Sequence, residues 1–315
     1  MHRSGDIILD ARNLNVSFGG VEAVRWLSMS IERGSIAGIV GESGSGKSTI
    51  LRCIAGLLKK NAAFSGDIVY EGASLFHERK NHLDLSTRRI SYVFQDPLSS
   101  LDPLYTIRSQ FDECLSIAGT LAKEEFELVE KNLLEDMGIK DIDRVLDSYP
   151  HQLSGGMCQR VVLAMCLGQK PDLLLADEPT SSLDVVSQAQ VLEKLKYIRN
   201  VHGTTILIVS HDIAAIAETA DHIGVMYKGV LVEEGTAEEI TRFPAHPYTR
   251  DLINSVPRLD GSLPKVPRAW VNSGDGASLL EKMETTSKAE LDYALLSETH
   301  RVLQCEESKD GSLCC

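Results

Sequence analysis

Residues 35–49 read SIAGIVGESGSGKST. The first six form a continuous apolar run, which predicts a strand buried on both faces of a sheet. The rest fits the pattern G-x-x-x-x-G-K-[ST], and a helix is predicted over residues 47–58 directly behind it. Backbone N–H groups of such a loop converge on phosphate, and the helix N-terminus adds partial positive charge. We therefore expect a phosphate-binding loop made of Gly41, Ser43, Gly44, Ser45, Gly46, Lys47, Ser48 and Thr49.

Two side chains of this loop carry specific expectations. In loops of this pattern the lysine reaches the β- and γ-phosphates of a nucleotide, and the following hydroxyl ligates Mg²⁺. Lys47 and Ser48 occupy these positions.

Around the loop, short β-like runs alternate with helical patterns, which predicts an α/β fold. Strands are expected over residues 7–18, 35–40, 89–94, 173–176 and 204–210, with a hairpin over 226–235 and helices over 124–137 and 186–201. The predicted division is an α/β core (1–95 and 170–240), a helical subdomain (96–169) and a C-terminal extension (241–315). The core is expected to close by about Gly235.

Composition excludes several classes of protein. The 315 residues are 43% hydrophobic, enough for a sizeable core, and carry a formal net charge of -13. Such an acidic balance argues against nucleic-acid binding. Seven cysteines without a CxxC pair indicate cytosolic usage rather than a disulfide framework. Neither a signal peptide nor an apolar run of about 18 residues is visible, so any role at a membrane requires a partner.

A second glycine motif determines what kind of phosphate-binding protein this is. Residues 153–160 read LSGGMCQR and precede a predicted helix. An SGG turn that opens a helix is a second anion-binding N-terminus, and two such separated sites suggest that one acts on a neighbour's nucleotide. LSGGM followed by QR resembles the signature motif of the ABC ATPase family.

Further motifs of that family follow in the family's order. Gln95 in FQDP (94–97) resembles the Q-loop, and Asp177 with Glu178 in LLLADEP (173–179) resembles Walker B with its adjoining glutamate. SSLD (181–184), which ends in Asp184, resembles the D-loop, and His211 in VSHD (209–212) resembles the switch histidine.

The resemblance implies a P-loop (RecA-like) ABC ATPase core that binds ATP and Mg²⁺ and works in a two-subunit sandwich. It implies that Ser48, Gln95 and Asp177 surround the metal. Glu178 is then the base that faces the attacking water, and Gln95, His211 and Lys47 complete the catalytic set.

Other nucleotide contacts are implied in the same way. Phe18 stands where the family places an aromatic that stacks on adenine. The resemblance assigns the remaining contacts, made across the dimer, to Ser154, Gly155, Gly156 and Asp184.

The C-terminal part indicates a branch of the family. HPYT (246–249) resembles the corresponding segment of ATPases from dipeptide, oligopeptide and nickel importers. That likeness implies two membrane-spanning permease subunits, a second ATPase of the same or a different kind, and indirectly an extracytoplasmic solute-binding protein. The chain would then lie peripherally on the cytoplasmic face of the inner membrane. Two alternatives stay open: the ATPase of an ABC exporter, and a soluble ABC ATPase unrelated to transport.

The tail after about residue 257 is expected to contribute neither to catalysis nor to metal binding. Relatives of this length often carry a cysteine cluster here, whereas this tail has Cys305, Cys314 and Cys315 with His300 nearby. We expect a packing or pairing element instead, with a helical segment lined by Leu279–Leu280, Met283, Leu291 and Leu295–Leu296.

Overall fold

The computed structural model describes residues 6–75, 89–119, 121–256 and 293–303. Its largest element is an eight-stranded sheet in the order β11-β12-β10-β9-β3-β8-β7-β6. The parallel part consists of β6 (Ile90–Val93), β7 (Leu173–Asp177), β8 (Thr205–Ser210), β3 (Ile36–Val40) and β9 (His222–Tyr227). The carboxyl ends of β3 and β7 meet at one edge of this sheet, where ligands bind in open α/β folds.

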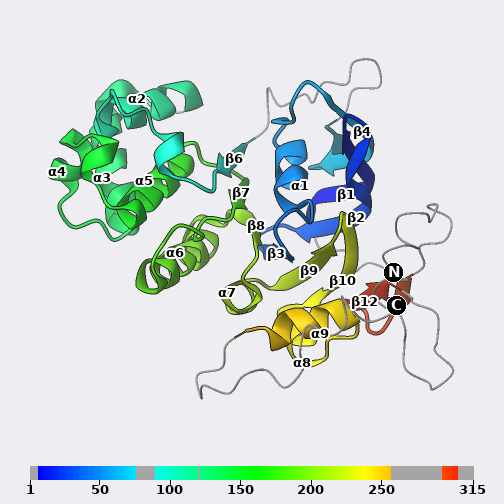
Figure 1. Ribbon diagram of the computed structural model, residues 1–315. Coiled ribbons are helices and arrows are strands. Elements are labelled where there is room, and N and C mark those ends of the chain that lie inside the picture. Colours follow the sequence, from blue (N-terminus) through cyan, green and yellow to red (C-terminus); the bar gives the residue numbers. More distant parts are fainter. Residues whose placement is uncertain (1–5, 76–88, 120, 257–292, 304–315) are drawn as a thin grey trace, which may run out of the picture.

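A smaller antiparallel sheet lies beside the first, in the order β2-β1-β4-β5. It consists of β1 (Ile7–Phe18), β2 (Val21–Glu32), β4 (Ala62–Tyr70) and β5 (Ala73–Ser74). Helix α1 (Lys47–Ile54) packs between the two sheets (Figure 1). Its buried side chains join one core cluster with alternate residues of β3, β7 and β8. Full burial of a Leu or Ile side chain stabilises a fold by about 1.5–3 kcal/mol, so this cluster fixes the position of α1 and of the loop before it.

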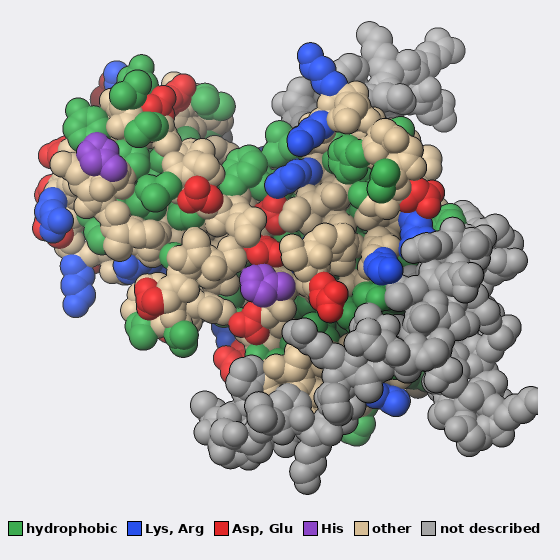
Figure 2. All heavy atoms as spheres, viewed as in Figure 1, with side chains coloured by type: hydrophobic (Ala, Val, Ile, Leu, Met, Phe, Trp, Pro, Cys, Tyr) green, Lys and Arg blue, Asp and Glu red, His purple; other side chains and the backbone are tan. Residues whose placement is uncertain are grey.

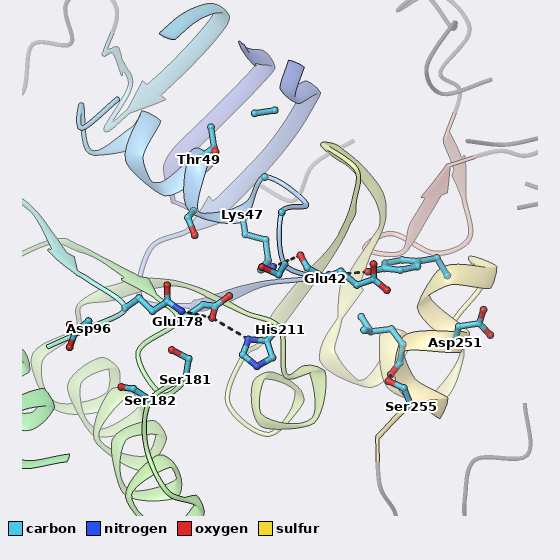
Figure 3. A pocket seen from close by; sticks show the side chains of 18 residues that line it. Glu42, Lys47, Thr49, Asp96, Glu178, Ser181, Ser182, His211, Asp251 and Ser255 are labelled. Carbon is cyan, nitrogen blue, oxygen red and sulfur yellow. Dashed lines mark hydrogen bonds and ion pairs between the residues drawn. The ribbon is translucent and has the colours of Figure 1, made fainter. Parts of the chain in front are cut away.

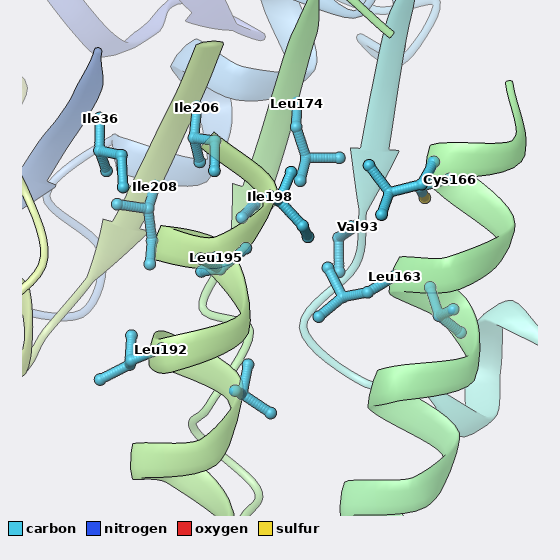
Figure 4. Packing of buried hydrophobic residues seen from close by; sticks show 14 of the residues in the cluster. Ile36, Val93, Leu163, Cys166, Leu174, Leu192, Leu195, Ile198, Ile206 and Ile208 are labelled. Atoms are coloured by element: carbon cyan, nitrogen blue, oxygen red, sulfur yellow. The ribbon is translucent and has the colours of Figure 1, made fainter. Parts of the chain in front are cut away.

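The other residues of the same strands face a second cluster, shown in Figure 4. Ile36, Leu174, Ile206 and Ile208 pack there against helix α5 (Gly155–Gly168) and helix α6 (Val185–Tyr197). Burial on both faces explains why these strands read as continuous apolar runs rather than alternating ones.

Helices occupy the region between residues 96 and 169 and gather at one side of the molecule (Figure 1). They are α2 (Ile107–Ala118), α3 (Phe126–Asp136), α4 (Ile142–Asp147) and α5. Three short helices cover the other end of the main sheet: α7 (Ile213–Ala217), α8 (Ala237–Arg242) and α9 (Pro247–Asn254).

The elements expected from the sequence are present, with shifted ends. Helix α1 stops at Ile54 rather than at residue 58, because Gly56 takes a φ of +67° and its N–H bonds back to Cys53. Helix α6 stops at Tyr197 and continues as a π-helical turn to His202. The hairpin forms from β9 and β10 (Val230–Thr236) around Lys228 and Gly229.

The expectation that the core closes by about Gly235 is wrong. Strand β12 (Arg301–Leu303) pairs antiparallel with β10, and β11 (Tyr293–Leu295) pairs with β12. Leu295, expected on a helix, therefore ends a strand and is exposed. Three-residue strands are too short to show a period, and the pairing of β12 with β10 spans more than 60 residues, so the sequence carried no signal for them. Leu296, expected on the same helix, follows the strand in a bend and is also exposed. The tail positions singled out at 279–291 and 305–315 lie outside the described residues.

Within the described ranges, no helix is both long and apolar enough to cross a membrane.

Candidate functional site

The glycine-rich loop packs so closely against neighbouring backbone that two of its glycines leave no room for a side chain. A Cβ at Gly41 would come within 2.2 Å of the Met226 carbonyl oxygen, and one at Gly46 within 2.4 Å of the Ala23 carbonyl oxygen. Gly46 also has a φ of +102° where it caps α1. The Ser45 carbonyl accepts a 3.0 Å hydrogen bond from the N–H of Gly229 in the β9–β10 turn. These contacts fix a loop that opens a helix, the arrangement that binds phosphate.

The side chain of Lys47 is folded back onto its own loop. Its ammonium donates to the carbonyl oxygens of Gly41 at 2.7 Å and Glu42 at 2.8 Å, and the residue is 4% exposed. Burial lowers the pKa of Lys47, and the carboxylates of Glu178, Asp177 and Glu42 oppose that shift. A cation held near several carboxylates can exchange its carbonyl contacts for phosphate oxygens, whose charge favours it more strongly.

Asp177 ends strand β7 against the start of α1. Ser48 Oγ donates to Asp177 Oδ1 at 2.6 Å, and Tyr92 Oη donates to Asp177 Oδ2 at 2.8 Å. Arg52 lies 3.6 Å from the same carboxylate, which is 1% exposed. A hydroxyl and a carboxylate oxygen in contact are the kind of oxygen donors that Mg²⁺ uses. Tyr92 and Arg52 were not predicted, because a tyrosine in a strand and an arginine in a helix have no motif that marks them.

Glu178 follows Asp177 in a strained conformation. Its φ is +45°, in the left-handed region that a glutamate rarely adopts, and its N–H donates to the Val209 carbonyl at 3.0 Å. The carboxylate accepts from Gln95 Nε2 at 3.1 Å and lies 3.1 Å from His211 Nδ1. Three residues predicted from separate motifs therefore meet at one carboxylate oxygen (Figure 3). Strain of this kind costs about 1–3 kcal/mol and concentrates at functional sites.

One cavity of about 1200 Å³ lies at this site, and among the described residues its lining includes Lys47 and Glu178 but not Asp177. On the surface of this face, acidic and histidine side chains meet near the centre, beside the helical part of the chain (Figure 2). The lining includes Gly44, Gly46, Lys47, Ser48, Thr49, Ser43, Gln95, Glu178 and His211.

Part of the cavity wall was not expected. Helix α9 contributes Tyr248, Asp251 and Leu252, and Ser255 caps its C-terminal end on the same side (Figure 3). The HPYT segment was taken from the sequence only as a mark of the branch. Its approach to the loop could not be inferred from spacing, since it depends on how α9 packs over β9.

The remaining predicted residues lie elsewhere. Ser154 caps α5 and Asp184 caps α6. A Cβ on Gly155 would lie 3.5 Å from Leu183 Cδ2, so the signature turn and the D-loop adjoin each other. Among the described residues, Ser181 and Ser182 of the D-loop line the cavity, whereas Asp184 and the signature turn do not. Phe18 is half-buried at the end of β1, packs against the core cluster around α1, and is likewise absent from that lining, to which Ala23 contributes.

Most of the chain is similar to known proteins of one family. Residues 24–181 match the family described as ABC transporter, and residues 232–278 match the oligopeptide/dipeptide transporter C-terminal region. The oligopeptide transport ATP-binding protein AmiE of Streptococcus pneumoniae is 40% identical over 278 residues, which cover 85% of this chain and 78% of AmiE. The dipeptide transport ATP-binding protein DppD of Haemophilus influenzae is 42% identical over 258 residues, covering 79% of this chain and 78% of DppD.

Solved structures agree. CbiO1 of Clostridium perfringens, part of an ABC transporter complex, superposes with a TM-score of 0.65 at 30% identity, covering 75% of this chain and 90% of its own. A dimeric cassette, MJ0796 bound to ADP and Pi, gives a TM-score of 0.62 at 27% identity, covering 73% and 98%. The P-loop α/β fold, the ordered motifs and these likenesses agree, and the chain belongs to the ATP-hydrolysing ATP-binding proteins of the ABC transporter family.

Proposed function

We propose that this chain binds MgATP at residues 41–49 and hydrolyses it to drive uptake of peptides through membrane-spanning partners. The observation that carries the catalytic part is the convergence of Gln95 and His211 on one oxygen of Glu178, beside the phosphate loop. ATP would lie with its phosphates over the loop and Lys47, and Phe18 is the proposed adenine contact.

Mg²⁺ would be held by Ser48, Asp177 and Gln95. The first two already form an oxygen pair at 2.6 Å, and Gln95 donates a hydrogen bond to Glu178, the residue after Asp177. When bound, the ion neutralises charge on the phosphate oxygens.

Glu178 is the proposed general base. Its carboxylate has an acceptor oxygen for the proton of an attacking water, and Gln95 and His211 hold that carboxylate in one orientation. Lys47 would stabilise the charge on the phosphate, for which its buried ammonium is suited.

A second ATPase subunit would complete each site. Ser154, Gly155, Gly156 and Asp184 adjoin each other outside this chain's own cavity lining, which supports their use on the nucleotide of a partner. The partner is either a second copy or a different ATPase of the same kind.

Peptides are the proposed solute class. The relatives reported above are named for oligopeptide and dipeptide transport, and the C-terminal match favours import over export and peptides over nickel. Two permease subunits and, indirectly, an extracytoplasmic binding protein would complete the machine, with this chain on the cytoplasmic face of the membrane. The helical subdomain at 96–169 would contact the permeases, and the core at 1–95 and 170–240 would bind ATP.

Reconstitution tests this function. The chain, its partner ATPase and the two permeases are placed in proteoliposomes, with binding protein outside and ATP inside. We expect uptake of a labelled peptide that needs ATP and stops with Glu178→Gln. Peptide uptake that persists with Glu178→Gln in both ATPases, or ATP turnover with uptake of nickel only, would contradict the proposal.

A further inference from the structure

One peptide unit of the phosphate loop is held from two sides. The carbonyl of Gly41 accepts a 2.7 Å hydrogen bond from Lys47 Nζ, and the N–H of Glu42, in the same peptide unit, donates to Tyr248 Oη at 3.0 Å. Because a peptide unit is planar, these two bonds together fix its orientation. Tyr248 belongs to α9, more than 200 residues along the chain, so the C-terminal region contacts the loop directly (Figure 3).

Tyr248 is itself held firmly. It is 2% exposed, and its ring packs against that of Tyr227 with centroids 4.4 Å apart. Its N–H donates to Nδ1 of His246 at 3.1 Å, where His246 caps the helix. Burial lowers the pKa of His246 to about 3, so this nitrogen stays unprotonated and accepts. The hydroxyl of Tyr248 therefore has little freedom to leave the loop.

The turn before Tyr248 is anchored by a buried carboxylate. Glu233 of β10 accepts from the N–H of Ala245 at 2.7 Å and from the N–H of His246 at 3.0 Å. His300 Nε2 lies 2.7 Å from Glu233 Oε1, and the two side chains are 5% and 0% exposed. A buried carboxylate needs such partners, because an unpaired charge is costly away from water. His300 directly precedes β12, so the tail supplies one of the groups that keep this turn in place.

We propose that Tyr248 is a positioning residue for ATP binding, and that the buried pair of Glu233 and His300 holds Tyr248 in register with the phosphate loop. Tyr248 keeps the N–H of Glu42 turned toward α9 and the carbonyl of Gly41 toward Lys47, so the loop is preorganised before nucleotide arrives. The inference rests on the proposed ATP site at residues 41–49. It also revises the expectation that the tail has no part in catalysis.

Tyr248→Phe tests the first step, because it removes one hydroxyl and keeps the buried ring. The dissociation constant of ATP is measured by calorimetry on the full-length chain, and KM and kcat are measured with the partner ATPase. We expect a dissociation constant and KM about two- to tenfold higher, the value of one neutral hydrogen bond, with kcat within about twofold. The matched control is Tyr197→Phe, which removes a hydroxyl bonded to Asp136 far from the loop and should leave affinity unchanged.

A double-mutant cycle tests the second step. His300→Gln should weaken ATP binding as Tyr248→Phe does, and the two together should weaken it no further than the stronger single change. If His300→Gln is too unstable to measure, Glu233→Gln replaces it in the cycle. This variant keeps one acceptor oxygen, so we expect a smaller loss of ATP affinity.

Three outcomes overturn the inference: unchanged ATP affinity with Tyr248→Phe, a loss confined to kcat, or additive effects of Tyr248→Phe and His300→Gln. Lys47→Ala separates this failure from failure of the proposed site. If Lys47→Ala abolishes ATP binding while Tyr248→Phe has no effect, only the positioning role is wrong. If Lys47→Ala binds ATP normally, the proposed site is wrong as well.

Discussion

The hydroxyl of Ser48 donates a 2.6 Å hydrogen bond to Oδ1 of Asp177, 129 positions further along the chain. The contact joins the first turn of α1 to the end of β7. It is possible because both elements are packed into the same core cluster, which brings the loop after one strand to the tip of another.

Asp177→Asn should reduce the response of ATP hydrolysis to magnesium. The amide keeps the shape but removes the charge that favours the ion, so we expect hydrolysis to fall by about tenfold or more and half-activation to need more Mg²⁺. Hydrolysis rates across a magnesium titration measure this. Asp172→Asn, which breaks the exposed pair with Arg89 just before β7, is the control and should leave the titration unchanged. Equal curves for wild type and Asp177→Asn would remove Asp177 from the metal site.

Glu178→Gln should separate binding from turnover. The amide retains the contact with Gln95 but cannot take a proton, so turnover should fall by about 10² or more while ATP affinity stays within about twofold. Single-turnover hydrolysis and calorimetry measure the two quantities. Glu193→Gln, on the exposed side of α6, controls for the loss of one charge. Near-normal hydrolysis in Glu178→Gln would show that another group is the base.

The rate should depend on subunit pairing. Ser154–Gly156 of one chain is proposed to act on the ATP of another, so specific activity should rise with the concentration of ATPase subunits, or on addition of the cognate partner. Activity over a hundredfold range of concentration, with sedimentation in ATP, tests this. A specific activity that stays constant while only monomer sediments contradicts the sandwich.

Glu130 should make stability depend on pH. Its side chain is 1% exposed on α3, and burial, aided by Asp112 nearby and opposed by Arg108, raises its pKa from 4.5 to about 8. The folded chain thus keeps a proton that the unfolded chain releases above about pH 4.5. The stability from this group is complete below that pH and is lost as the pH rises toward 8.

Glu130→Gln imitates the protonated acid at every pH. Its unfolding midpoint, relative to wild type, should therefore rise between pH 5 and pH 8 and then level off, a window set by the two pKa values. Thermal unfolding followed by circular dichroism gives the midpoints. Glu135→Gln, exposed on the same helix, should show no such trend. If the unfolding midpoints of Glu130→Gln and wild type differ by the same amount at every pH, Glu130 is ionised in the folded chain.

Exposed apolar side chains at the start of the helical subdomain should affect coupling rather than ATP binding. Leu104 and Tyr105 are 79% and 55% exposed in the segment before α2. If this surface contacts a permease, Leu104→Ser with Tyr105→Ser should leave ATP affinity unchanged and reduce peptide-stimulated hydrolysis in proteoliposomes several-fold. Val201→Ser, 59% exposed on the π-helical turn after α6 and outside the helical subdomain, is the control. Loss of ATP binding would place this surface in the nucleotide site instead.

Much of the catalytic half of the site could be read from short contiguous patterns. The loop at 41–49 combines glycines, a lysine and a hydroxyl over nine positions, and Asp177 and Glu178 end an apolar strand. Such motifs can be recognised in the sequence because residues that are close along the chain remain close together in the folded protein. The parallel strands were readable for a related reason: burial on both faces leaves an unbroken apolar run.

The tertiary structure alone decided what surrounds those motifs. Tyr92 and Arg52 reach Asp177, Tyr248 reaches Glu42, and His300 reaches Glu233 only because elements far apart in the chain pack on the same sheet. No motif in the surrounding segment predicts any of these four contacts. His300 lies 67 positions from Glu233, and Tyr248 lies 206 positions from Glu42. Hydrogen bonds act over about 3 Å, so they depend on how helices and strands pack rather than on spacing along the chain. The sequence by itself determined that this chain binds and hydrolyses a nucleotide, and the packing of its C-terminal region onto the sheet decided what holds the loop in place.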